Sequence, residues 1–410
     1  MKSATRDLLI KETCQMLRCI ENQKIRGAEQ CMRLDPGIYT EPLHHRREIE
    51  LLFRRVPLIL AASAELPLTG DYRTVELAGI PLLITRGADH KVQVYLNACT
   101  HRGAQVVTGS GNSGRFTCPY HGWTYAADGR LIGISSAEVF DHPDKSAGGL
   151  ITFPAEERGG FIWALLTQDA ELPLTDFLGT LEDVIEAYQL QNWHLFHQNA
   201  LDGPNWKLAF DAHLEFYHLP VLHRNTFGTQ ISNMAQYFFY GPHQRLGLMS
   251  DNTVGDNADA ISRLSTKPIE QWSTEDLLFG EWIIFPNVSL NCFDLGVRAM
   301  VLSQILPTAD SQRSVTVQTF LTESIPDDEH VSKVNEFVEF IQSIVRDEDL
   351  ALEQTQQQTI NSGLMPEFLL GKNEEGLQHH HATLQRILAH ESPLTSDFWS
   401  QELARTKTST

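Results

Sequence analysis

Four residues between positions 99 and 121 have the types and the spacing of a metal site. Cys99-x-His101 is followed, after sixteen residues, by Cys118-x-x-His121, so each of two short segments supplies one thiolate and one imidazole. Conventional zinc fingers pair cysteine with cysteine and histidine with histidine, whereas here the two types alternate. There are two alternatives to a cluster site built by both segments together. One is an unusual zinc site, and the other is that the four residues never come together in the fold.

The alternation of ligands favours a Rieske-type [2Fe–2S] cluster. In such a cluster both cysteines hold one iron and both histidines hold the other, so two loops clamp the cluster from either side. Glycines at Gly103 and Gly122 fit loops whose backbone must turn sharply. Two neutral imidazoles in place of thiolates raise the reduction potential, which makes the site a one-electron relay.

A second group of metal-ligand residues lies in the segment NWKLAFDAHLEFYHLPVLHR, residues 205–224. We expect a helix that places Glu215 and His218, three residues apart, on one face. Pro220 should end or distort that helix and let His223 return towards His218. Two imidazoles and one carboxylate form the facial triad that holds non-haem Fe(II) with open positions. The competing interpretation is that both histidines are polar residues satisfied inside a core.

The carboxylate of such a triad must come from another part of the chain. The C-terminal segment RDEDLALEQTQQQ offers three acidic residues in succession, Asp347, Glu348 and Asp349. The residues alone do not choose among them.

The surrounding elements have a mixed helix and strand character. An amphipathic helix is expected over residues 4–25, short β-rich runs over about 70–165, helix again over 170–200, and then further strands. A segment of some thirty residues without glycine or proline, beginning at about residue 327, predicts one long helix or two joined ones.

Composition limits the classes of partner. The chain has 410 residues, 42% of them hydrophobic, and a formal charge of −20, which disfavours nucleic acid or an anionic membrane as partner. The sequence contains neither a membrane-spanning apolar run nor a signal peptide, so we expect a soluble, cytoplasmic protein. The six cysteines are better explained as thiols or metal ligands than as disulfides.

These segments resemble the oxygenase component, or α subunit, of the Rieske non-haem iron aromatic-ring-hydroxylating oxygenase family. The likeness spans about residues 35–385 and rests on the two Cys–His segments and on Asn205-Trp206-Lys207 ahead of carboxylate-x-x-His-x4-His. It implies an α+β fold with a small antiparallel β Rieske domain and a larger catalytic domain whose antiparallel sheet is flanked by helices (helix-grip, START-like). The expected division is an N-terminal helical segment packing on the catalytic domain (1–46), the Rieske domain (47–166) and the catalytic mononuclear iron domain (167–410).

The resemblance also assigns roles to residues. It implies that the cluster is held by Cys99, His101, Cys118 and His121, and the mononuclear iron by His218, His223 and Asp349. In the family the third ligand is usually an Asp followed eight residues later by Gln, which matches Asp349 and Gln357 and leaves Glu348 as the alternative. Glu215 stands where a carboxylate connects a Rieske histidine of a neighbouring subunit to an iron-bound histidine. The family more often has Asp there, so the bridge would contain one extra methylene.

The implied function is that of the terminal oxygenase in a multicomponent enzyme. Electrons from NAD(P)H would arrive through a reductase, with or without a ferredoxin, since the chain lacks a glycine-rich dinucleotide fingerprint. With O2, the enzyme would mono- or dihydroxylate, or oxidatively demethylate, a small apolar aromatic or polycyclic substrate. The expected assembly is a head-to-tail homotrimer, with or without a small β subunit.

Two further interpretations remain open. A Rieske electron-transfer protein, or a degenerate homologue without catalytic iron, would keep the first site and treat the second as structural. The apolar runs at 234–241 and 282–293 would line a substrate pocket or belong to the core. His213 and Cys292 would accordingly either pack inside the protein or face that pocket.

Overall fold

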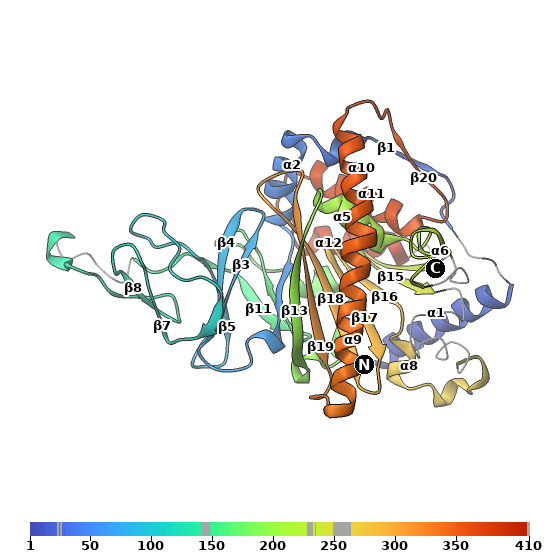
Figure 1. Ribbon diagram of the computed structural model, residues 1–410, viewed down its shortest axis with the longest axis horizontal. Coiled ribbons are helices and arrows are strands. Elements are labelled where there is room, and N and C mark those ends of the chain that lie inside the picture. Colours follow the sequence, from blue (N-terminus) through green and yellow to red (C-terminus); the bar gives the residue numbers. More distant parts are fainter. Residues whose placement is uncertain are drawn as a thin grey trace.

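A seven-stranded antiparallel sheet forms the centre of the larger part of the molecule (Figure 1). The computed structural model describes residues 1–22, 24, 27–140, 148–227, 233, 235–248 and 264–407. The strand order is β13-β19-β18-β17-β16-β15-β14. Their bounds are β13 His194–Gly203, β14 Ala235–Tyr240, β15 His243–Leu248, β16 Glu281–Ile284, β17 Val288–Asp294, β18 Arg298–Pro307 and β19 Ser314–Thr322.

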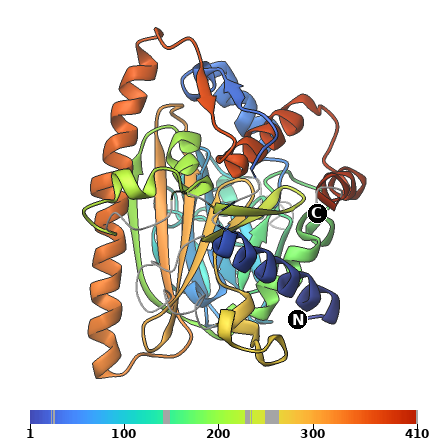
Figure 2. The same cartoon turned by 90° about the vertical axis from the view of Figure 1, so that its right-hand side faces the viewer.

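Helices cover this sheet. A long rod consists of α9 (Asp328–Ile344), a π-helical turn (Val345–Asp349) and α10 (Leu350–Asn361), and it runs along the sheet at the left of Figure 2. The shorter helices near the sheet are α3 Leu174–Leu178, α4 Thr180–Ala187, α5 Trp206–Asp211, α6 Leu219–Leu222, α8 Thr274–Leu277, α11 Glu375–Ala389 and α12 Ser396–Lys407. The expected long C-terminal helix is therefore present, with the π-helical turn at its middle.

The smaller part of the molecule is built from short antiparallel strands between residues 58 and 164, at the left of Figure 1. It contains three sheets, ordered β10-β5-β4-β3-β6, β11-β12-β2 and β7-β8-β9. The strands are β2 Leu58–Ala62, β3 Asp71–Leu77, β4 Ile80–Arg86, β5 Val92–Leu96, β6 Ser110–Asn112, β7 Arg115–Thr117, β8 Thr124–Ala126, β9 Leu131–Gly133, β10 Thr152–Phe153, β11 Ala155–Arg158 and β12 Phe161–Ala164. Together the two parts confirm the predicted α+β class.

Polar side chains join the two parts. Gln304 of β18 donates from Nε2 to the carbonyl of Ile59, at 2.8 Å, and Arg73 of β3 donates to Oε1 of Gln198 in β13, at 2.9 Å. Hydrogen bonds of this kind fix the relative register of two packed units, because the groups involved would be costly to bury unpaired.

The N-terminal segment lies on the larger part. Glu12 of α1 (Ser3–Asn22) accepts hydrogen bonds from Tyr240 and from Arg245, both on the sheet. Strand β1 (Met32–Leu34) pairs with β20 (Phe368–Leu370), and α2 (Pro42–Glu48) follows. The predicted boundaries at residues 46 and 166 stay a prediction.

Within the described residues, no helix combines the length and the apolar character needed to cross a membrane.

Candidate functional site

Two similar turns carry the four Cys–His residues. In the first, the Gly103 N–H donates to the carbonyl of Cys99 at 2.7 Å, and in the second the Gly122 N–H donates to the carbonyl of Cys118 at 3.0 Å. Both glycines have positive φ, +78° and +72°, in the left-handed region that side chains disfavour. The glycines therefore let each turn close four residues after its cysteine.

The two turns bring their side chains together. The imidazole rings of His101 and His121 lie 4.7 Å apart between centroids, and His101 stacks on Trp123 at 5.0 Å. Cys99 and Cys118 are buried in the same small core. The Nδ1 atom of His101 is buried without a hydrogen-bond partner. Two adjacent imidazoles, one with an unpaired buried nitrogen, together with two buried thiols make up the two nitrogen and two sulfur ligands that such a cluster requires.

Tyr125 is a residue of this site that sequence reasoning missed. Its hydroxyl lies 3.2 Å from the Cys99 sulfur and 3.0 Å from the Thr100 N–H. Burial and the neighbouring Cys99 raise the pKa of Tyr125 to about 12, so the hydroxyl keeps its proton near neutral pH. It is therefore able to donate to the sulfur, and such hydrogen bonds tune the potential of iron–sulfur clusters. Its position two residues after Trp123 was the available signal.

The second site is made by three side chains from two elements. His218, His223 and Asp349 each offer one ligand atom, and these atoms all lie within 4.8 Å of one another. The shortest approach joins His223 Nε2 to Asp349 Oδ1 at 3.2 Å. Asp349 Oδ1 is nevertheless buried without a hydrogen bond, so the approach lacks hydrogen-bond geometry. Ligand atoms that converge on one point without a hydrogen bond between them are suited to bind a cation. A set of two imidazoles and one carboxylate is typical of non-haem Fe(II) sites.

Each histidine is oriented by a carboxylate on its other nitrogen. Glu215 Oε1 lies 2.6 Å from Nδ1 of His218, and Glu348 Oε2 lies 2.7 Å from Nδ1 of His223. Since an ionised carboxylate only accepts, both Nδ1 atoms carry a proton, and in each neutral ring this leaves the Nε2 lone pair to bind a metal. Glu348 also accepts a hydrogen bond from Thr226. Glu348, expected as the alternative ligand, thus stands behind His223 rather than beside Asp349.

The backbone around Glu215 differs from the expectation. The prediction that Glu215 and His218 share a helical face is wrong: α5 ends at Asp211, and Glu215 has extended backbone, with φ −154° and ψ 160°. Its carboxylate instead accepts from the backbone N–H groups of Tyr217 and His218. Pro220 does not end a helix but lies in the first turn of α6, where its missing N–H costs nothing.

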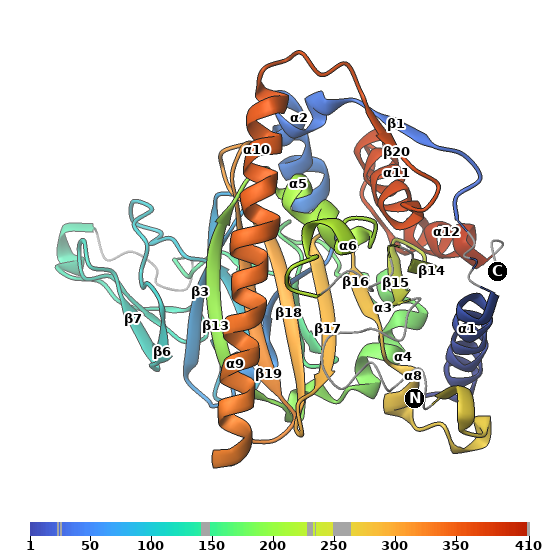
Figure 3. The ribbon, with the colours of Figure 1, turned by 45° about the vertical axis from the view of Figure 1, so that its right-hand side comes forward.

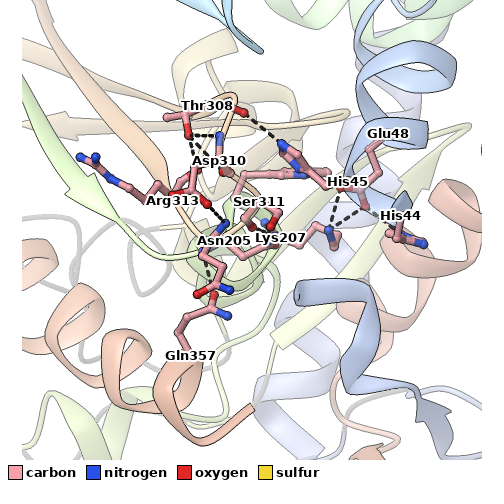
Figure 4. Close-up of polar contacts among 12 residues, drawn as sticks. His44, His45, Glu48, Asn205, Lys207, Thr308, Asp310, Ser311, Arg313 and Gln357 are labelled. Carbon is pink, nitrogen blue, oxygen red and sulfur yellow. Dashed lines mark hydrogen bonds and ion pairs between the residues drawn. The ribbon is translucent and has the colours of Figure 1, made fainter. Parts of the chain in front are cut away.

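Asn205 connects the two halves of the second site (Figure 4). Its side chain caps α5 by accepting from the Lys207 N–H at 3.0 Å, and its Nδ2 donates to the Ser311 carbonyl at 2.6 Å. Its own N–H donates to Oε1 of Gln357 at 3.0 Å. Because Gln357 lies two turns beyond Asp349 on α10, this bond fixes the helix that carries Asp349 against the segment that leads to the histidines.

A buried ion pair holds α5 from the other side. Lys207 Nζ lies 2.6 Å and 2.8 Å from the two oxygens of Glu48 in α2, and both side chains are essentially inaccessible to solvent. Trp206 Nε1 donates to the same carboxylate at 3.0 Å, and His44 Nε2 approaches it at 3.1 Å (Figure 4). The Asn205-Trp206-Lys207 motif therefore positions the second site without touching it.

A cavity of about 230 Å³ opens beside His218, His223 and Asp349. Its remaining wall is mostly apolar and includes Phe216, Phe227, Phe279, Phe293, Ile341 and Val345. Of the two runs expected to line a pocket or a core, residues 282–293 contribute three cavity residues, Asn291, Cys292 and Phe293. The described residues of the run 234–241 belong to the core, and Met234 lies outside the described residues.

Two family models match the chain. The model of the Rieske [2Fe–2S] domain covers residues 56–143, and the model of the ring hydroxylating alpha subunit catalytic domain covers residues 190–390.

Curated relatives match different shares of the chain. The glycine betaine monooxygenase oxygenase subunit of Chromohalobacter salexigens is 31% identical over 192 residues, which make up 46% of this chain and 43% of the relative. The choline monooxygenase of Spinacia oleracea chloroplasts is 25% identical over 373 residues, 85% of this chain and 77% of the relative. The chain thus spans less than half the length of the glycine betaine relative that it matches.

Solved structures share the fold. The quaternary ammonium Rieske monooxygenase CntA superposes with a TM-score of 0.71 at 20% identity, over 87% of this chain and 95% of that chain. Naphthalene 1,2-dioxygenase with indole bound gives a TM-score of 0.72 at 17% identity, over 92% of this chain and 97% of that chain. The two domain models in succession show that the chain belongs to the family of Rieske oxygenase alpha subunits, whose catalytic domain binds mononuclear non-haem iron.

Proposed function

We propose that this chain is the terminal oxygenase component of a multicomponent Rieske oxygenase. It would use O2 and electrons from NAD(P)H, delivered by a reductase with or without a ferredoxin, to hydroxylate or oxidatively demethylate a small organic molecule. The observation that carries the proposal is the convergence of His218, His223 and Asp349 on one point at the end of a mostly apolar cavity. A purely structural role for the two histidines would not explain why three ligand atoms gather around Asp349 Oδ1, which is buried without a hydrogen bond.

In this proposal Cys99, His101, Cys118 and His121 hold the cluster, and His218, His223 and Asp349 hold the iron. Iron bound there would supply the activation of dioxygen. The chain's own contribution is to orient the ligands: Glu215 and Glu348 keep the protons on Nδ1, so that Nε2 of each histidine faces Asp349. The aromatic and aliphatic wall excludes water, which protects a reactive site from side reactions.

We further propose that the active assembly is a head-to-tail homotrimer. Strand β7, next to the second cluster turn, lies at the left of Figures 1 and 3, well away from α6, which follows His218. Beside Glu215, the side chains of Tyr217 and Val221 are 54% and 73% exposed, and Tyr120 beside His121 is 61% exposed. Exposed apolar groups at both places suit a contact between neighbouring subunits. Glu215 has lone pairs left for a donor from that neighbour, despite its extra methylene.

The cavity limits the size of the substrate. Its volume of about 230 Å³ lies below the usual range for drug-sized ligands, roughly 300–1,000 Å³, so a small molecule is favoured over a steroid. The curated relatives named above are monooxygenases of glycine betaine and choline, which are both small molecules.

Metal analysis and turnover test the proposal together. The purified chain should contain about three irons and about two acid-labile sulfides, and with a surrogate reductase it should consume oxygen when a substrate is present. Mass analysis of the product then counts one added oxygen or two. A content of about two irons with no oxygen consumption would instead identify a Rieske electron carrier. Glu215→Ala should keep both metal sites and slow turnover, and an unchanged rate would refute its place at the subunit junction.

A further inference from the structure

One histidine–carboxyl pair stands out in the mostly apolar cavity. His213, on the turn that follows α5, and Glu281, the first residue of β16, both line the cavity, and His213 Nδ1 lies 3.1 Å from Glu281 Oε1. They are 68 residues apart in sequence, so the fold brings them together.

Glu281 is held from behind by the sheet. Ser289 of β17 donates to the same Oε1 at 2.5 Å, and Asn291, which pairs with Glu281 in the strand register, donates to Ser289 Oγ at 3.2 Å. Ser289 is fully buried and Glu281 is 8% exposed, so neither depends on bulk solvent for its orientation. Burying a carboxylate this deeply costs free energy unless it has hydrogen-bond partners. The partners of Glu281 also point its carboxylate at His213.

This arrangement fixes what His213 presents to the cavity. Since Glu281 Oε1 is an acceptor, Nδ1 of His213 carries the proton. In the neutral ring Nε2 then has a free lone pair, and among the described residues it forms no hydrogen bond. The pair is thus a preoriented hydrogen-bond acceptor on the wall of an apolar cavity.

The other ionisable groups of the wall set its charge. The described cavity-lining residues include no Lys or Arg, whereas carboxyl groups are present in Glu281, Glu353 and Asp349. Burial and the nearby Asp349 raise the pKa of Glu353 well above its usual value, so this group is a neutral acid. Apart from the iron site itself, the described wall therefore offers no cation to an acidic ligand, and the Glu281 carboxyl group beside His213 disfavours such a ligand.

We propose that His213, positioned by Glu281, accepts a hydrogen bond from a hydroxyl or amino group of the substrate, so that this site takes small apolar molecules with one such donor and rejects acids. The proposal rests on the proposed function, because it names the substrate class of that same site. His213 is a specificity residue that touches the ligand, and Glu281 is the residue that positions it. A site built around a fixed polar partner discriminates strongly against ligands that leave the partner unpaired.

Equilibrium binding to the metal-loaded protein, without reductase, tests this proposal independently of turnover. The probes are 4-methylphenol, toluene and 4-methylbenzoate, which share a ring and differ in one substituent. The wild-type chain should bind 4-methylphenol about tenfold more tightly than toluene, as one net hydrogen bond allows, and 4-methylbenzoate most weakly. Equal affinities for the phenol and toluene, or no binding of the phenol, would overturn the proposal.

Variants then assign the preference to the pair. His213→Phe should abolish the preference for the phenol while toluene affinity stays within about twofold. Glu281→Gln should reduce the same preference, because the ring loses its orienting anion. Val301→Ala, another change in the cavity wall, is the control and should weaken the phenol and toluene alike. Persistence of the preference in His213→Phe would refute the assignment. If the preference follows these rules but no ligand stimulates oxygen consumption, the proposed function fails and the binding site stands.

Discussion

The buried pair of Glu48 and Lys207 allows a prediction with a defined magnitude. Glu48→Gln removes the negative charge that faces Lys207 at 2.6 Å and 2.8 Å, while Lys207 stays 1% exposed. Breaking a buried ion pair from one side leaves an uncompensated charge, so the free energy of unfolding should fall by about 3–5 kcal/mol. Removing both charges in Glu48→Leu with Lys207→Met should cost less than the sum of the single changes.

The pH dependence of this loss gives an independent check. Burial alone would raise the pKa of Glu48, but the Lys207 ammonium, with His44 and His45, outweighs burial and lowers the pKa below its ordinary value of 4.5. A carboxyl with a lowered pKa in the folded state stabilises the protein above its unfolded pKa, and this contribution disappears as the pH falls towards the folded value. The difference between the wild type and Glu48→Gln should be largest near pH 7 and should shrink below about pH 4.5.

Urea titration followed by tryptophan fluorescence measures both effects, since Trp206 donates to the same carboxylate. Glu50→Gln is a matched control: Glu50 lies two residues away and pairs with Arg54 at the surface, where such a pair contributes roughly 0–1 kcal/mol. A loss below about 1 kcal/mol for Glu48→Gln, or a loss independent of pH, would refute the reasoning.

Three further predictions concern the second site. His218→Ala should remove about one iron per chain, as iron analysis would show, and should leave the visible absorption of the cluster intact. A colourless protein would contradict the presence of two separate metal sites. Glu348→Gln should weaken Fe(II) affinity about 10–100-fold in a chelator competition, because His223 loses its orienting carboxylate; unchanged affinity would argue against that role. Glu353→Met should raise the unfolding temperature more at pH 8 than at pH 4, because the pKa of Glu353 is raised and the folded chain must keep its proton; equal gains would mean that Glu353 is not a neutral acid.

The cluster turns could be predicted from the sequence because each is local. Cys99 and His101, like Cys118 and His121, lie within one turn, and the glycine that closes each turn follows within two residues of the histidine. Spacing along the chain therefore reports spacing in the structure.

The second site was harder to predict because its parts are distant in sequence. Asp349 lies more than 120 residues after His223, and only the family pattern of an Asp followed eight residues later by Gln favoured it over Glu348. Both residues belong to the π-helical turn that precedes α10, and the register of that turn decides which carboxylate meets the Nε2 atoms. The helix expected through Glu215 failed for a different reason. The carboxylate of Glu215 satisfies the N–H groups of Tyr217 and His218, which competes with continuing the helix.

The pairing of His213 with Glu281 had no signal in the sequence at all. Nothing along the chain indicates that the turn after α5 faces the first residue of β16. Such pairs depend on the order of strands in the sheet, which local patterns do not determine.

The π-helical turn at Val345–Asp349 shifts the rotational register of α10 about the helix axis relative to that of α9. The face that α9 presents to the sheet is set by Val334, Phe337 and Val338. Asp349, the last residue of the turn, and Glu353 of α10 must instead both face the cavity. In a continuous α-helix the direction of one face would fix the direction of the other. One extra residue in the turn rotates the second face by about 100° relative to the first. The packing of α9 on the sheet and the direction of the metal-site face are thus set separately, and deletion of a single residue in the turn would misalign that face.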